Sequence, residues 1–172
     1  NDKSQIQEIY HKSSLYLFLF GGFFLINILT NIHTVLQFLP DGFQRGEPVV
    51  IIFSIGALIN MATGVNGSIL NTSEKFRYGA FYYILLAILL IGFQVVFIPV
   101  FGMIGAALAT TSAQIIYNLL VFLTVYKFFK LQPFNIKNLY VLIIIICTCT
   151  LSYLLPHFEN KFFDIGVRTA VV

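Results

Sequence analysis

Long apolar stretches without a charged side chain dominate the chain. Five of them contain no Asp, Glu, Lys or Arg, and they cover residues 14–39, 48–72, 78–100, 103–126 and 138–155. At about 1.5 Å of rise per residue, each is long enough as a helix to cross about 30 Å of hydrocarbon. Strands of membrane barrels are about ten residues long and alternate in polarity, which these stretches do not. The pattern predicts an all-α integral membrane protein, a polytopic bundle of transmembrane helices.

Two shorter segments flank these stretches. Residues 1–12 place Ile6, Ile9 and Tyr10 on one side of a helix, which predicts an amphipathic lead-in at the cytoplasmic surface. Residues 162–172 have the composition expected at the start of a further membrane helix. We therefore expect residues 1–172 to form an interior or C-terminal portion of a longer polytopic membrane protein.

The overall composition excludes two classes of protein. Hydrophobic residues make up 58% of the chain and charged residues only 10%, against about 25% charged in typical soluble domains. A soluble domain of this size cannot hide so much apolar surface, and a disordered chain would be far more polar. The formal net charge of +3 is too small to indicate nucleic-acid binding.

Basic residues collect on one side of the predicted bundle. That side holds seven of the ten: Lys3, Lys12, Lys75, Arg77, Lys127, Lys130 and Lys137. The opposite side holds Arg45 and Lys161, and Arg168 falls in the final segment. Because Lys and Arg in short connections favour the cytoplasmic side, we expect the residue 1 side of this multi-pass chain to be cytoplasmic.

The first apolar stretch carries a stripe of uncharged polar side chains. With about 100° between successive helical residues, four of them fall on one face: Asn27, Thr30, Asn31 and Thr34. Polar groups in a bilayer are costly unless they face water or a partner helix. The stripe therefore either lines a water-filled substrate cavity or bonds to a neighbouring helix. We favour the cavity, because this stripe contains no small residue through which helices pack closely.

Small residues mark the second and fourth stretches. Asn60 lies among glycines on one helical face, which makes it a candidate cavity residue or a contact between helices. Small residues that share one helical face, as in the second stretch, or that recur every four residues, as in the fourth, favour close helix packing. On this basis we expect packing positions at Gly64, Gly67, Gly102, Gly105, Ala106 and Ala109.

Candidate catalytic and metal-binding groups are missing from the five stretches. They hold no Asp or Glu for acid–base chemistry, and the sequence has no glycine-rich phosphate loop and no His/Glu metal spacing. Cys147 and Cys149 do not have the spacing of a redox or zinc motif, and they read as buried apolar residues. The sequence therefore predicts no enzyme activity, catalytic residue, metal or cofactor.

Two segments resemble the O-antigen and capsular polysaccharide flippases. Residues 66–77, NGSILNTSEKFR, are similar to the end of a span and the basic turn after it in that family. Residues 98–110, IPVFGMIGAALAT, resemble its helical hairpin of Ile-Pro, a turning Gly and a Gly-Ala-Ala run. The family is part of the multidrug/oligosaccharidyl-lipid/polysaccharide exporter superfamily. The resemblance covers residues 1–130 best and the remainder by topology alone.

The resemblance implies a two-lobed transporter fold of about twelve to fourteen helices, with a central cavity that opens alternately to each side. By the same resemblance, residues 1–172 would be the C-terminal portion of this polytopic transporter. It implies a flippase of the bacterial cytoplasmic (inner) membrane that moves a lipid-linked oligosaccharide outward during polysaccharide, lipopolysaccharide or capsule assembly. The implied partners are that lipid-linked oligosaccharide, membrane lipid and other membrane proteins of polysaccharide assembly.

Two alternatives remain open at this point. A multidrug/toxin extrusion antiporter of the same superfamily would ordinarily need an intramembrane acid, which the five stretches lack. A membrane-embedded polysaccharide polymerase or ligase would be expected to carry a large outer loop with charged catalytic groups. The outer connections in this sequence are short.

Overall fold

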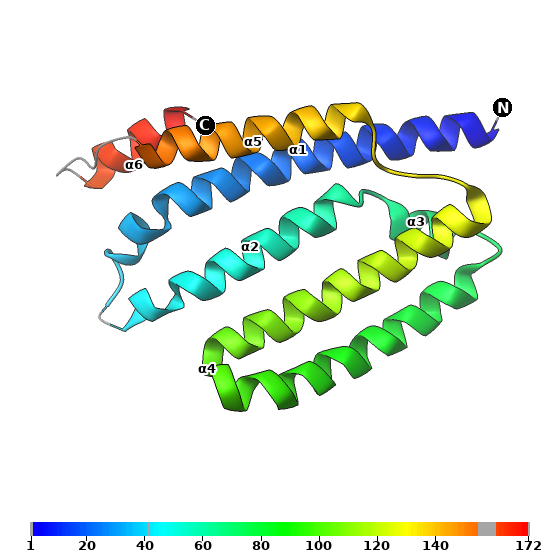
Figure 1. The fold of residues 1–172 in the computed structure, drawn as a ribbon, viewed down its shortest axis with the longest axis horizontal. Helices are drawn as coiled ribbons and strands as arrows, with labels where there is room; N and C mark the ends of the chain where they lie inside the picture. The colour runs from blue at the N-terminus through cyan, green and yellow to red at the C-terminus, as the bar shows by residue number, and fades with distance from the viewer. Residues whose placement is uncertain (1, 41, 155–160, 172) are drawn as a thin grey trace.

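The computed structural model describes residues 2–40, 42–154 and 161–171, and its regular structure there is entirely helical (Figure 1). The elements are α1 (Asp2–Leu36), η1 (Phe43–Gly46), α2 (Glu47–Ala62), α3 (Asn66–Asn71), α4 (Phe76–Phe129), α5 (Ile136–Leu154) and α6 (Lys161–Val171). The prediction of an all-α chain is confirmed for these residues, whereas the two-lobed transporter fold stays a prediction. Residues 1, 155 and 172, which the predicted segments include, lie outside the described part.

Helix α1 runs without a break from the predicted lead-in into the first apolar stretch and ends at Leu36, before the predicted end at residue 39. It is 35 residues long, or about 52 Å at 1.5 Å per residue. Tyr10 is fully buried and belongs to a core cluster with Leu70, Val121 and Val125. The described part of the predicted lead-in is therefore the beginning of α1, and it packs into the bundle through Tyr10.

The second apolar stretch is interrupted, which corrects the prediction of one helix over residues 48–72. Helix α2 ends before Gly64, and α3 begins after it. Gly64 has a φ of +63°, and a Cβ there would lie 3.0 Å from the Ser14 backbone nitrogen of α1. Glycine permits both the left-handed turn and the close approach. Asn60 and Gly67 consequently lie on different helices and do not continue one face.

Helix α4 is a hairpin with a first limb (residues 76–101) and a second limb (residues 103–129) (Figure 1). The chain reverses at Gly102, whose φ of 57° and ψ of −129° suit glycine and are not helical. Just beyond the turn, a Cβ at Gly105 would overlap the carbonyl oxygen of Phe97. The hairpin predicted between the third and fourth stretches is confirmed, and glycine lets its two limbs touch.

The helices lie side by side in an open row (Figure 1). Helix α1 packs between α5 and α2, and α2 packs against the second limb of α4. The short helix α6 contacts both α1 and α5. Because each helix is covered mainly along its flanks, the broad faces of the row stay exposed and carry many large apolar side chains.

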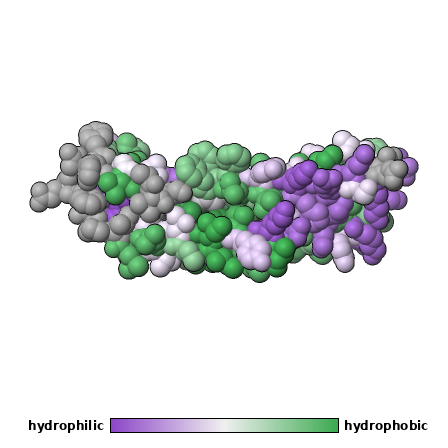
Figure 2. Space-filling view, turned by 90° about the horizontal axis from the view of Figure 1, so that it is seen from above, coloured by the Kyte–Doolittle hydropathy of each residue, from purple (hydrophilic) through white to green (hydrophobic). Residues whose placement is uncertain are grey.

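Among the residues that the structure describes, three helices are long and apolar enough to cross a membrane: Lys3–Leu36, Phe43–Ala62 and Phe76–Phe129. On the first limb of α4, Ile84, Ile88 and Val95 are more than 60% exposed, which would be unfavourable in water and is natural in hydrocarbon. Figure 2 shows hydrophilic residues gathered at the end of the molecule that contains the start of α1, with apolar residues along the middle. These features indicate a membrane protein.

Candidate functional site

The polar stripe of α1 divides into a half-exposed part and a buried part. Asn27 and Thr30 are half-buried, and each donates a hydrogen bond to a carbonyl of its own helix: Asn27 Nδ2 to Phe23 O (2.9 Å) and Thr30 Oγ1 to Ile26 O (2.8 Å). Such bonds lower the cost of a polar side chain in a membrane helix without fixing a second helix. These two residues therefore remain accessible to a polar partner from outside the chain.

The buried part of the stripe meets α6. Asn31 and Thr34 are each 6% exposed. Asn31 Nδ2 donates to Thr169 Oγ1 at 3.4 Å, and Thr34 Oγ1 donates to Asp164 Oδ2 at 3.3 Å. The other atom of the Asn31 amide, Oδ1, is buried and has no hydrogen-bond partner among the described residues. In this structure Asn31 and Thr34 thus face a neighbouring helix. Asn27 and Thr30 are the members of the stripe that remain candidates for lining a cavity.

A buried ion pair lies at this contact, and sequence reasoning missed it. Asp164 and Arg168 are 2% and 3% exposed, with Arg168 Nε 3.1 Å from each carboxylate oxygen of Asp164. Arg168 Nη1 also donates to the carbonyl oxygen of Ser152 in α5 at 3.0 Å. Together with Asn31 and Thr34, these residues form what we call the α6 junction, which connects α1, α5 and α6. The available signal was the i,i+4 spacing of an acid and a base in an otherwise apolar segment.

Asn60 lies away from the α1 stripe. Its Oδ1 accepts a hydrogen bond of 3.0 Å from Asn118 Nδ2 on the second limb of α4, and Asn118 is only 4% exposed. One turn earlier on α2, a Cβ at Gly56 would lie 2.8 Å from Thr111 Cγ2 of the same limb. The structure therefore places Asn60 in the contact between α2 and α4 and does not bring it together with Asn27 and Thr30.

The predicted packing positions differ in how closely they are covered. Gly105 and Ala109 are buried, whereas Ala106 is half-buried on the neighbouring row of the same limb. A Cβ at Gly67 would meet nothing nearer than the Tyr117 hydroxyl at 4.0 Å, and one at Gly102 would meet nothing. Gly102 is therefore required for the turn, and Gly105 for the close approach of the two limbs.

A glycine pair in α1 was missed as a packing site. A Cβ at Gly21 would lie 2.7 Å from Met61 Sδ of α2, and a Cβ at Gly22 would overlap the Ile145 side chain of α5. Adjacent helical positions point about 100° apart, so two neighbouring glycines admit two different helices. The sequence signal was the Gly-Gly pair itself.

Comparisons with known proteins provide no relative from which a role could be transferred. No family model, no curated protein and no solved structure matches the chain. Within the described residues, no group of three or more His, Cys, Asp or Glu side chains is placed to hold a metal ion.

Proposed function

We propose that this chain belongs to a flippase that moves a lipid-linked oligosaccharide across the bacterial inner membrane during polysaccharide assembly. The observation that supports the proposal best is the polar stripe of α1. A helix long enough to cross a membrane carries accessible but uncharged polar side chains at Asn27 and Thr30. The resemblance of residues 66–77 and 98–110 to the polysaccharide flippases agrees with this function.

The chemistry of such a substrate suits this arrangement. Sugar hydroxyls both donate and accept hydrogen bonds, and Asn and Thr side chains do the same without carrying a charge. A sugar headgroup needs polar side chains at membrane depth, whereas its lipid tail needs only hydrocarbon. The exposed apolar faces of the row, such as that of Ile84 and Ile88, leave room for the tail in the surrounding lipid.

The surroundings of Asp164 favour the flippase over the antiporter. An antiporter ordinarily uses an intramembrane acid that exchanges a proton or a cation. The buried acid of this chain is held by the Arg168 guanidinium at 3.1 Å, so its negative charge is already matched. No observation on the described residues favours a polymerase or a ligase.

The replacement Asn27→Leu tests this function. Because the Asn27 side chain bonds only to its own helix, its loss should leave the bundle intact while removing a sugar contact. We expect glycan export to fall at least severalfold at a normal membrane level of the protein. The measurement is surface glycan per unit of protein in cells whose export depends on this transporter.

Asn60→Leu is the matched control. It leaves the buried Asn118 amide unpaired, so it should lower the amount of protein rather than the export by each molecule. Normal export by Asn27→Leu at a normal protein level would contradict the proposal that the stripe contacts the glycan.

A further inference from the structure

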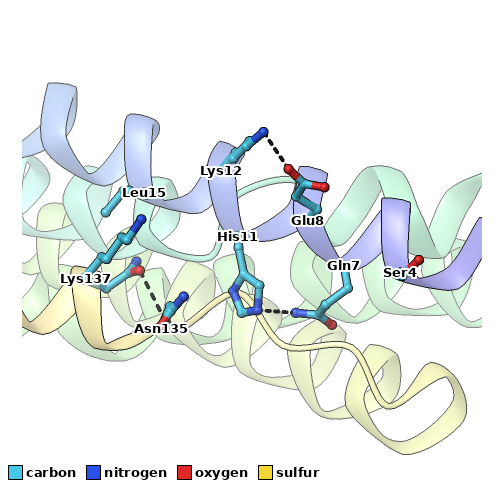
Figure 3. A pocket seen from close by; sticks show the side chains of 9 residues that line it. Ser4, Gln7, Glu8, His11, Lys12, Leu15, Asn135 and Lys137 are labelled. Carbon is cyan, nitrogen blue, oxygen red and sulfur yellow. Dashed lines mark hydrogen bonds and ion pairs between the residues drawn. The ribbon is translucent and has the colours of Figure 1, made fainter.

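A pocket of about 370 Å³ lies between the first turns of α1 and the chain that leads from α4 into α5 (Figure 3). We call it the basic pocket. It is lined by Ser4, Gln7, Glu8, His11, Lys12, Leu15, Asn135, Lys137 and Asn138. Neither the polar stripe nor the α6 junction contributes a residue to it, so the transport proposal leaves it without a role.

Hydrogen bonds fix the walls of the basic pocket. Gln7 Nε2 donates to the carbonyl oxygen of Gln132 at 2.7 Å, and Gln7 Oε1 accepts from the backbone nitrogen of Gln132 at 3.2 Å. His11 Nδ1 lies 3.1 Å from the carbonyl oxygen of Pro133. These contacts join two segments more than 120 residues apart in the chain. The pocket is therefore formed before any ligand arrives.

The charge of the pocket suits an anion. Lys12 Nζ is paired with Glu8 Oε1 at 2.7 Å, whereas Lys137 has no ion pair within the described part of the chain. One positive charge is thus left over. The N-terminus of the 19-residue helix α5 lies at the wall of the pocket, where the positive end of the helix dipole also favours an anion. The side-chain amide of Asn135 supplies further hydrogen-bond donors at the wall.

The position of the pocket, at the boundary between polar and apolar surface, indicates the kind of anion. Its one apolar lining residue is Leu15, which stands at the beginning of the uncharged stretch of α1. Tyr16 and Tyr140 are each 59% exposed nearby in sequence, and tyrosine is enriched where a membrane meets water. Figure 2 shows the change from hydrophilic to apolar surface at this end of the molecule. Anions at that level of a membrane are the phosphates of lipid headgroups.

We propose that the basic pocket binds the phosphate of a lipid headgroup, with Lys137 as its main charged contact and the lipid chains running past Leu15 into the bilayer. The phosphate can come from a membrane phospholipid or from the diphosphate of a polyprenyl carrier. Binding requires only that the chain lies in a membrane, so the proposal does not rest on the flippase function.

Lipid binding to the purified full chain, measured by native mass spectrometry, tests the proposal. The probes are phosphatidylglycerol, undecaprenyl diphosphate, diacylglycerol with the same acyl chains, and inorganic phosphate. We expect K137Q to weaken the first bound phosphate lipid about fivefold, as for loss of one basic side chain at a membrane surface. E8Q should strengthen binding, because it frees Lys12 from its ion pair.

K130Q is the matched control. Lys130 lies in the same basic end, over the ring of Tyr126, but does not line the pocket. It should leave lipid binding unchanged. If K137Q affects only phosphatidylglycerol or only undecaprenyl diphosphate, that lipid is the occupant. Equal effects of K137Q and K130Q would overturn the proposal. So would binding of diacylglycerol or inorganic phosphate as tight as that of the phosphate lipids.

Discussion

At the scale of single residues, two ion pairs have the same spacing along a helix but differ in how far they are buried. Glu8–Lys12 and Asp164–Arg168 both join residues four apart on a helix, at 2.7 Å and 3.1 Å. The side chains of Glu8 and Lys12 are 65% and 62% exposed, whereas those of Asp164 and Arg168 are 2% and 4% exposed. Water screens the first pair, so its contribution to stability is small despite the shorter distance. In the second pair, losing one partner would leave a buried charge unmatched.

Arg168→Leu should therefore destabilise the chain strongly. Removing one partner of a buried ion pair costs about 3–5 kcal/mol, because the remaining charge stays in an apolar site. The double variant Asp164→Leu/Arg168→Leu should recover much of that loss, since no charge is left to bury. Equilibrium unfolding in mixed detergent micelles measures both variants. Lys12→Leu is the exposed control and should change the free energy of unfolding by less than about 1 kcal/mol. A double variant as unstable as Arg168→Leu would contradict the ion-pair explanation.

At the scale of elements, the sequence predicts helices better than it predicts their breaks. Hydropathy locates the helical stretches, because an apolar run long enough to cross a bilayer satisfies its backbone hydrogen bonds most simply as a helix. It also locates the hairpin, since Pro99 and Gly102 lie close together at the end of a run. The break at Gly64 could not be predicted in this way. Its positive φ accompanies a contact with Ser14, fifty residues earlier, and local periodicity contains no information about that contact.

For the candidate site, too, the sequence predicts the helix face but not the contacts that bury part of it. The stripe of Asn27 to Thr34 could be recognised from a helical period, because all its members lie on one helix. The burial of Asn31 and Thr34 could not be predicted, because the residues that contact them, Asp164 and Thr169 of α6, lie about 130 residues later in the chain. Which polar face is accessible and which is buried depends on where such a distant helix packs.

Gly105→Ala and Gly92→Ala test the hairpin as a matched pair within α4. A Cβ at Gly105 would overlap the backbone carbonyl of Phe97, which cannot move aside without shifting the other limb. We expect Gly105→Ala to destabilise the chain by about 1–3 kcal/mol, as overpacking does. A Cβ at Gly92 meets nothing within 4 Å, so Gly92→Ala should be neutral or stabilising by up to about 1 kcal/mol. The unfolding midpoint in detergent measures both, and equal midpoints would show that the limbs do not touch at Gly105.

At the scale of the whole molecule, charge and apolar surface are separated along one direction. The start of α1, the α3–α4 connection and the α4–α5 connection lie at one end of the row, and the α1–α2 connection lies at the other (Figure 1). The basic residues of the chain concentrate at the first end. Each limb of α4 is about 39 Å long at 1.5 Å per residue, more than the hydrocarbon thickness of about 30 Å. Both ends of the row can therefore reach water while the apolar faces stay in lipid.

Orientation follows from this separation and can be tested with introduced cysteines. In a chain with Cys147 and Cys149 replaced by alanine, single cysteines are placed at Gly42, Phe101, Ser73 and Gln132. The first two positions lie in the sparsely charged connections, and the last two lie in the basic ones. Because Lys and Arg in short connections are retained in the cytoplasm, an impermeant thiol reagent added to intact cells should label positions 42 and 101 only. Permeabilised cells should show labelling at all four positions, which controls for accessibility. Labelling of positions 73 and 132 in intact cells would reverse the orientation and place the basic pocket at the outer surface.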